Sequence, residues 1–178
     1  MIKRPSSIEQ LSNALRRSPV TALLGPRQCG KTTLARVFGQ NRVAAYFDLE
    51  SRPDQTRLQN PELALSGLKG TVILDEIQSM PELFNVLRVL VDRPKNQGRF
   101  LILGSASPEL MKKASETLAG RIEFVELTGF TLAEIKSKDE RKLWLRGGFP
   151  RSFLASSNKD SASWREGFIR TFLERDIP

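Results

Sequence analysis

The sequence contains no histidine and only one cysteine. The lack of histidine excludes histidine-based triads, histidine general bases and most catalytic zinc sites, so carboxylates, lysine and arginine must carry any chemistry. A single cysteine excludes an intramolecular disulfide, which fits a reducing compartment. The chain has no apolar run of the roughly 18 to 20 residues that span a membrane, and its start lacks the pattern of a signal peptide. We therefore expect a cytoplasmic protein with no membrane partner.

The charge of the chain is strongly positive. Its 178 residues carry a net charge of +8 and are 39% hydrophobic, which suits a globular protein with one sizeable core. The basic residues are spread along the whole chain, and no run of them is longer than two. Two interpretations stay open: a nucleic-acid partner, or an ordinary solvated surface with part of the excess at an anion site.

Residues 25–32, Gly-Pro-Arg-Gln-Cys-Gly-Lys-Thr, match the phosphate-loop pattern GxxxxGK[ST]. Gly25 and Gly30 allow backbone angles and a close phosphate approach that a Cβ would obstruct. Backbone N–H groups and the start of the following helix then face the anion. Lys31 places positive charge on the β- and γ-phosphates, and the Thr32 hydroxyl is suited to ligate Mg²⁺. The residues predicted to bind ATP are Gly25, Pro26, Arg27, Gln28, Cys29, Gly30, Lys31, Thr32 and Thr33.

A second motif lies at residues 71–78, Thr-Val-Ile-Leu-Asp-Glu-Ile-Gln. Its continuous apolar run predicts a parallel strand buried on both faces. The carboxyl end of such a strand lies at the edge where open α/β sheets bind ligands. We predict that Asp75 holds Mg²⁺ and that Glu76 polarises a water for in-line attack on the γ-phosphate. Together the two motifs predict Mg-dependent ATP hydrolysis, with ATP and Mg²⁺ as cofactors.

Apolar runs and helical patterns alternate along the rest of the chain. Helices are expected between the strands, one of them opened by a capping box of Ser6 and Glu9, while residues 51–60 are expected to be loop. This alternation predicts an α/β fold of three layers, with a mainly parallel five-stranded sheet and helices on both faces. A helical appendage is expected after Phe130, with its longest helix at 163–176. The predicted strands are residues 20–24, 44–50, 71–75, 99–103 and 122–127.

These motifs resemble the prokaryotic AAA-type ATPases, P-loop proteins of the AAA+ superfamily that normally carry a further domain of unknown function (DUF4143-type). The resemblance covers nearly the whole chain. Besides the two motifs, it rests on Gly104-Ser105 and on residues 118–122, 146–150 and 164–178.

The resemblance implies a P-loop core over residues 1–130, with an extra strand between the two phosphate motifs, and a helical lid over residues 131–178. It also implies that Asp75 ligates magnesium and that Glu76 activates water. Family members usually continue into a domain similar to restriction-type nucleases. Because Pro178 ends this sequence, we expect either a fragment of a longer protein or the product of a truncated gene, with the effector region absent in both cases.

Leu103 stands where the family usually has a threonine that senses the γ-phosphate. Leucine cannot form that hydrogen bond, so sensing passes to Ser105 or Ser107, or is impaired. Ser105 is the candidate, and the alternative is a turn serine that caps the next helix. Arg121 is predicted to lie near the active-site edge as an arginine finger, in cis or from a neighbouring subunit. The alternative for Arg121 is a surface salt bridge. Arg151, after the Gly-Gly-Phe-Pro break, is a separate candidate for a lid arginine.

Three functions remain in competition. The leading hypothesis is an ATPase, with Glu76, Lys31, Arg121 and Ser105 as its catalytic residues, that couples hydrolysis to a lid and a downstream effector. The second is a nucleotide-gated switch with negligible turnover, with DNA association left open. The third is a nucleotide or small-molecule kinase, against which the adjacent carboxylates argue. A homo-oligomer also stays open, and Cys29 is either a redox-sensitive thiolate or a small residue that fits the loop.

Overall fold

The computed structural model describes residues 2–40, 44–94 and 98–176. The chain divides into two compact units. The larger unit holds Arg4–Pro26 and Lys31–Leu127. The smaller unit holds the first three residues, Arg27–Gly30 and Thr128–Pro178.

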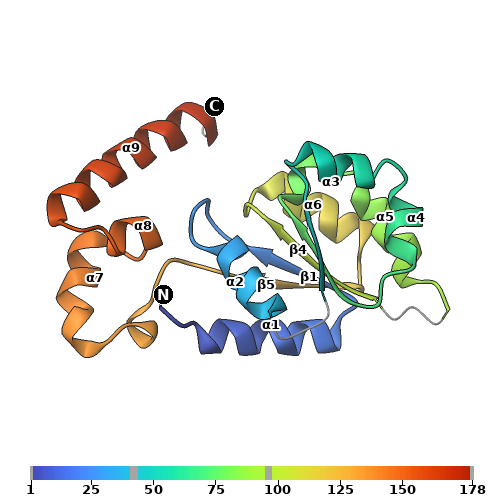
Figure 1. The fold of residues 1–178 in the computed structure, drawn as a ribbon, viewed down its shortest axis with the longest axis horizontal. Helices are drawn as coiled ribbons and strands as arrows, with labels where there is room; N and C mark the ends of the chain where they lie inside the picture. Colours follow the sequence, from blue (N-terminus) through green and yellow to red (C-terminus); the bar gives the residue numbers. More distant parts are fainter. Residues whose placement is uncertain (1, 41–43, 95–97, 177–178) are drawn as a thin grey trace. The chain divides into compact units, whose positions relative to one another are not determined.

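The larger unit is built on five parallel strands in the order β2-β3-β4-β1-β5 (Figure 1). Every residue of β1 is buried, as its continuous apolar run predicts. Strand β4 lies between the two strands that carry the motifs, so the extra strand implied by the resemblance is present. The strands are β1 Val20–Leu24, β2 Ala44–Asp48, β3 Gly70–Asp75, β4 Gly98–Gly104 and β5 Ile122–Glu126.

Helices cover both faces of this sheet. Side chains of α5 and α6 pack with Val20 and Ala22 in one continuous core cluster. Because successive strand residues point to opposite faces, Leu23 lies on the other face, where α1 packs along β1 and β5. The predicted three-layer α/β/α fold is confirmed. The helices of this unit are α1 Pro5–Arg17, α2 Lys31–Gly39, α3 Arg52–Arg57, α4 Pro61–Ser66, the 3₁₀ turn η1 Ile77–Ser79, α5 Leu83–Val91 and α6 Pro108–Thr117.

Two local predictions for this unit are wrong. Helix α1 begins at Pro5, and its N-cap residue Arg4 makes no side-chain capping bond, so the expected capping box of Ser6 and Glu9 does not form. Proline has the fixed φ that the first turn of a helix needs, and this starts the helix earlier. The segment 51–60 is not all loop, because it contains the six-residue helix α3.

The smaller unit is helical after residue 130. Its longest helix begins five residues earlier than predicted, because Ser157 accepts a hydrogen bond from the Asp160 N–H at 3.0 Å and caps the helix start. Its elements are η2 Leu132–Glu134, η3 Ser137–Asp139, α7 Glu140–Arg146, α8 Pro150–Phe153 and α9 Asn158–Asp176.

Arg146 and Gly148 explain why residues 146–150 carry a distinctive string. The Arg146 guanidinium is buried, and it donates to the Asn158 side-chain oxygen at 2.8 Å and to the Ala155 carbonyl. A Cβ on Gly148 would lie 2.5 Å from the Phe130 carbonyl oxygen, so only glycine allows this close backbone contact.

Aromatic rings form a row along α9. The Trp164 ring stacks on Phe168 at a centroid distance of 5.1 Å, and Phe149 lies 5.0 Å from Phe168. Phe172 continues the row at 6.0 Å from Phe168. Throughout residues 2–40, 44–94 and 98–176, no helix has both the length and the hydropathy to cross a bilayer.

Candidate active site

The two sequence motifs meet at one edge of the sheet. Strand β4 pairs with both β1 and β3, with Ile102 level with Ala22 on one side and with Leu74 on the other. The start of the phosphate loop after β1, Asp75 at the end of β3, and Ser105 after β4 therefore lie at the carboxyl edge of the parallel strands. Open α/β sheets bind their ligands at this edge.

Lys31 is folded back on the start of the loop. Its ammonium group donates to the carbonyl oxygens of Gly25 at 2.8 Å and Pro26 at 3.0 Å. The side chain is only 6% exposed, so these two carbonyls satisfy a charge that would otherwise be costly to bury. The cation is therefore held where the loop turns back on itself.

Residues 27–30, in the middle of the loop, have an unusual backbone. Gln28 and Gly30 both have positive φ, at 62° and 102°. Turns that include a left-handed residue direct successive N–H groups to one side and form anion-binding concavities. Cys29 between them is fully buried, which supports a packing role over an accessible reactive thiol.

Thr32 and Asp75 meet directly. The Thr32 hydroxyl donates to Asp75 Oδ2 at 2.8 Å, and the Glu76 N–H donates to Asp75 Oδ1 at 3.0 Å. Hydroxyl and carboxylate oxygens are the hard ligands that Mg²⁺ prefers, and at phosphate sites Mg²⁺ needs only one or two protein ligands. The described residues contain no group of three or more His, Cys, Asp or Glu that could hold a metal by themselves. The donor set at Thr32 and Asp75 therefore fits a magnesium ion shared with phosphates.

Tyr46 also binds Asp75, although it lies outside both sequence motifs. Its hydroxyl donates to Asp75 Oδ2 at 2.5 Å, and the Arg36 guanidinium carbon lies 5.2 Å from its ring centroid. Burial, with the hydrogen bond to the Asp75 carboxylate, raises the pKa of Tyr46 well above its ordinary value of 10.0, so the phenol stays a donor. The available signal was that this is the only tyrosine of the chain, on a predicted strand. The order of strands, which places it beside β3, could not be read from the sequence.

Glu76 is held by a second residue that the sequence analysis did not single out. Its backbone is left-handed, with φ 56° and ψ 52°, and its carboxylate accepts a hydrogen bond from the Gln78 amide nitrogen. The other amide atom, Gln78 Oε1, is buried and has no hydrogen-bond partner. The conformation of this loop thus sets Glu76 apart from Asp75, although the two are adjacent in sequence.

The serines after β4 differ from each other. Ser107 caps α6 by accepting from the Leu110 N–H at 3.3 Å, whereas the Ser105 carbonyl accepts from the Ser107 N–H at 2.8 Å. The serine that caps α6 is therefore Ser107. Ser105 stays the candidate sensor of the γ-phosphate. Leu103 is fully buried inside β4.

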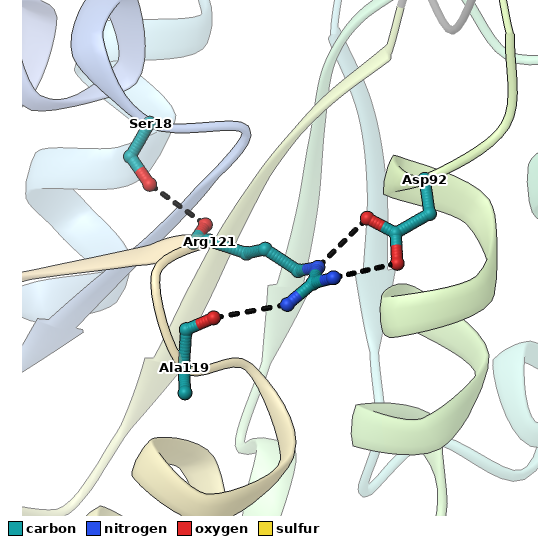
Figure 2. Close-up of polar contacts among 4 residues, drawn as sticks. All are labelled: Ser18, Asp92, Ala119 and Arg121. Carbon is teal, nitrogen blue, oxygen red and sulfur yellow. Dashed lines mark hydrogen bonds and ion pairs between the residues drawn. The ribbon is translucent and has the colours of Figure 1, made fainter.

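Arg121 lies at the opposite edge of the sheet from the phosphate loop. It precedes β5, and its carbonyl accepts from the first residue of β1, Val20, at 3.1 Å. Its guanidinium binds both carboxylate oxygens of Asp92 at 2.7 and 2.9 Å and the Ala119 carbonyl at 3.0 Å, and the Ser18 hydroxyl binds its backbone (Figure 2).

The prediction that Arg121 lies near the active-site edge is therefore wrong. The prediction that Arg121 acts as an arginine finger in cis is wrong for the same reason. In a parallel sheet, a residue just before a strand lies at the amino edge, away from residues that follow strands. The alternative interpretation, a surface salt bridge, describes this arginine. A contribution to a neighbouring subunit stays a prediction. Arg151 is exposed on α8, and its role also stays a prediction.

Comparisons with known proteins cover nearly the whole chain. A family model described as an AAA domain matches residues 17–136. A domain of unknown function (DUF8612) matches residues 137–178, and it differs from the DUF4143 type named by the resemblance.

Two uncharacterized proteins, from Mycobacterium bovis and Mycobacterium tuberculosis, are each 56% identical to this chain over 177 residues. The match covers 99% of this chain and 40% of each relative, so the chain spans less than half of their length. The Walker-type ATPase of Pyrococcus abyssi has a similar structure, with a TM-score of 0.71 over 98% of this chain and 75% of that chain. Its sequence identity is 16%, so this likeness concerns the fold.

Proposed function

Because the chain belongs to the AAA domain family, we propose that it binds ATP with Mg²⁺ at the carboxyl edge of the sheet and hydrolyses the β–γ phosphoanhydride. One observation carries the proposal. Thr32 at the end of the phosphate loop donates to the buried carboxylate of Asp75 at 2.8 Å, so the loop and the carboxylate motif form one site. Lys31 lies in the same loop, bound to its first two carbonyls.

The proposed roles follow from the chemistry of each group. Residues 25–33 surround the phosphates, and the backbone N–H groups of this segment, which Pro26 lacks, bind the phosphate oxygens. Lys31 exchanges its carbonyl partners for the β- and γ-phosphate oxygens. Thr32 and Asp75 would hold Mg²⁺, which neutralises charge on the transferring phosphoryl group. Glu76 takes a proton from the attacking water as the water oxygen bonds to the γ-phosphorus and the bond to the β–γ bridging oxygen breaks. The Gln78 amide holds one Glu76 oxygen and leaves the other for that proton.

Two substitutions test binding and catalysis separately. We expect Lys31→Ala to lose ATP binding in calorimetry, because a buried cation that faces the phosphates is removed. We expect Glu76→Gln to keep binding and to slow hydrolysis by about 10²–10⁴-fold, the usual contribution of a general base. Lys112→Ala and Glu116→Gln are matched controls, because both side chains are well exposed on α6. Equal loss of ATP binding in Lys31→Ala and Glu76→Gln would contradict the assigned roles.

A nucleotide-gated switch with negligible turnover is the second candidate. The buried Leu103 favours it, because this side chain offers no hydrogen bond where the family resemblance implies a sensor threonine. The ATPase and the switch differ in the rate at which they release phosphate from ATP. A wild-type chain that binds ATP with Mg²⁺ and releases phosphate no faster than Glu76→Gln is a switch, and faster release supports the ATPase.

We also propose that residues 1–130 are the ATPase core and that residues 131–178 act as a lid whose conformation follows the nucleotide. The mycobacterial relatives are longer than this chain, which leaves room for an effector region that receives the change. We assign the role of γ-phosphate sensor to Ser105, because Ser107 is the serine that caps α6.

A further inference from the structure

The carboxylate of Asp75 is held by neutral groups. It is 3% exposed, and its described hydrogen-bond donors are two hydroxyls and one backbone N–H. The hydroxyls of Thr32 and Tyr46 both bind Oδ2, at 2.8 and 2.5 Å, and the Glu76 N–H binds Oδ1 at 3.0 Å. A buried carboxylate is tolerated only when its oxygens are hydrogen-bonded, so each of these donors helps to fix its orientation.

Tyr46 differs from the other two donors because it comes from a separate strand. Thr32 belongs to the phosphate loop, and the Glu76 N–H is the next group along the same chain segment as Asp75. Tyr46 lies on β2, where it pairs with Ile73 two residues before Asp75. Its ring is half-buried, with the Arg36 guanidinium over it. The Tyr46 hydroxyl is therefore held in place by β2 and restricts the orientation of the Asp75 carboxylate.

We propose that Tyr46 is a positioning residue for the magnesium site, acting through Asp75. Its hydroxyl holds Asp75 Oδ2 beside the Thr32 hydroxyl. Asp75 Oδ2 and the Thr32 hydroxyl oxygen are then both in place when the metal arrives with the phosphates. Residues that hydrogen-bond to the carboxylates of a metal site usually change metal affinity by about 10–100-fold when they are removed. The inference rests on the proposed function and adds a residue that neither phosphate motif contains.

The test is the magnesium dependence of ATP binding in Tyr46→Phe. Phenylalanine keeps the ring and its packing. It removes the hydroxyl, which hydrogen-bonds to Asp75 and is also in hydrogen-bond contact with the Arg36 side chain. Calorimetry would measure ATP binding with excess Mg²⁺ and again with EDTA. We expect about tenfold weaker binding with Mg²⁺ and unchanged binding in EDTA. Mn²⁺ titrations with ATP, followed by water proton relaxation, should show the same loss without any turnover.

Arg36→Met is the matched control. It removes the cation above the ring and keeps the hydroxyl, so both ATP affinities should stay near wild type. If this variant shows the same magnesium-specific loss as Tyr46→Phe, the effect does not belong to the hydroxyl and the inference is wrong. Circular dichroism melts would show that both variants fold.

Three other results of the Tyr46→Phe experiment would also contradict the inference. Equal weakening with Mg²⁺ and with EDTA would assign Tyr46 to the fold alone. Tighter binding with Mg²⁺ would mean that the hydroxyl competes with the metal for Oδ2. No change in either condition would leave Tyr46 without a role at the metal. Each of these overturns the inference while wild-type ATP binding leaves the proposed function intact, whereas a wild type that binds no ATP overturns the proposed function itself.

Discussion

At the scale of single residues, two adjacent carboxylates have different surroundings. Asp75 is buried among hydrogen-bond donors, whereas Glu76 is partly exposed on a left-handed backbone. A non-glycine residue in that conformation costs about 1–2 kcal/mol. Such strain persists where the surrounding structure over-determines it, often at functional sites. The loop after β3 thus gives up stability to separate the proposed metal ligand from the proposed proton acceptor.

Asp92 gives the first prediction. The Arg121 guanidinium lowers the pKa of Asp92 below its ordinary value of 3.8. A carboxyl with a lower pKa in the folded state stabilises the fold above its ordinary pKa, and this stabilisation is lost as the pH falls through the folded value. We expect the free energy of unfolding, from urea titrations between about pH 5 and pH 2, to fall more steeply in wild type than in Asp92→Asn.

Arg121→Ala provides the matching control. It leaves Asp92 without its cationic partner, so its pH slope should resemble that of Asp92→Asn. Because the pair lies away from the phosphate loop, Arg121→Ala should keep the ATP affinity of the wild type. Identical slopes in all three proteins would show that the ion pair does not form in solution.

The residue-scale predictions that agree with the geometry are those from consecutive motifs. Lys31 and Thr32 are placed by local backbone geometry, so a short string is enough to predict where they lie. Tyr46 depends on which strands are neighbours, and this is a property of the whole sheet. Arg121 lies away from the predicted place because it precedes a parallel strand, and such residues lie at the amino edge of the sheet.

At the scale of elements, the end of β4 is tightly packed against α6. A Cβ built on Gly104 would lie 2.7 Å from Leu110 Cδ2, and 3.2 Å from both Ile77 Cγ2 and Gln78 Oε1. We expect Gly104→Ala to lower the free energy of unfolding by about 1–3 kcal/mol, the usual cost of overpacking. Urea denaturation measures it.

Gly67→Ala is the control for that substitution. Gly67 caps α4 with a negative φ of −90°, and nothing lies within 4 Å of a Cβ built there. Alanine at such a position should stabilise the fold by about 0.4–1 kcal/mol through the unfolded chain. A loss of stability at Gly67 as large as that at Gly104 would contradict the packing argument.

Elements with an apolar pattern were predicted better than exposed ones. All five strands appear at the expected places. Strands β1, β3 and β4 are marked by apolar runs typical of strands buried on both faces. Helix α3 was missed because none of its residues is buried, so no apolar periodicity marks it. The early start of α9 depends on Ser157, whose capping pattern with Asp160 was present in the sequence and was not used.

At the scale of the whole molecule, the chain combines a net charge of +8 with the proposed ATP site. The charge is spread through the sequence, and a nucleic-acid partner stays a prediction. Binding of a ligand to the folded state alone stabilises that state by mass action. The proposed function therefore has a consequence for the stability of the entire chain.

We expect ATP with Mg²⁺, at about one hundred times its dissociation constant, to raise the free energy of unfolding by about 2.7 kcal/mol. Thermal melts with and without the nucleotide would measure this as a higher Tm. Lys31→Ala should show no such rise, because it lacks the cation that faces the phosphates. A rise of equal size in both proteins would mean that the nucleotide binds elsewhere.

The tryptophans and the tyrosine lie in different parts of the chain, so they can serve as separate spectroscopic probes. Both tryptophans follow residue 130, with Trp144 93% exposed on α7 and Trp164 stacked in the α9 row. The single tyrosine, Tyr46, lies beside Asp75. Fluorescence excited at tryptophan wavelengths therefore originates only from the helical segment. A nucleotide titration followed by this emission reports on that segment without an attached dye. The ultraviolet absorbance of the phenol reports on Asp75, the carboxylate proposed to hold the metal.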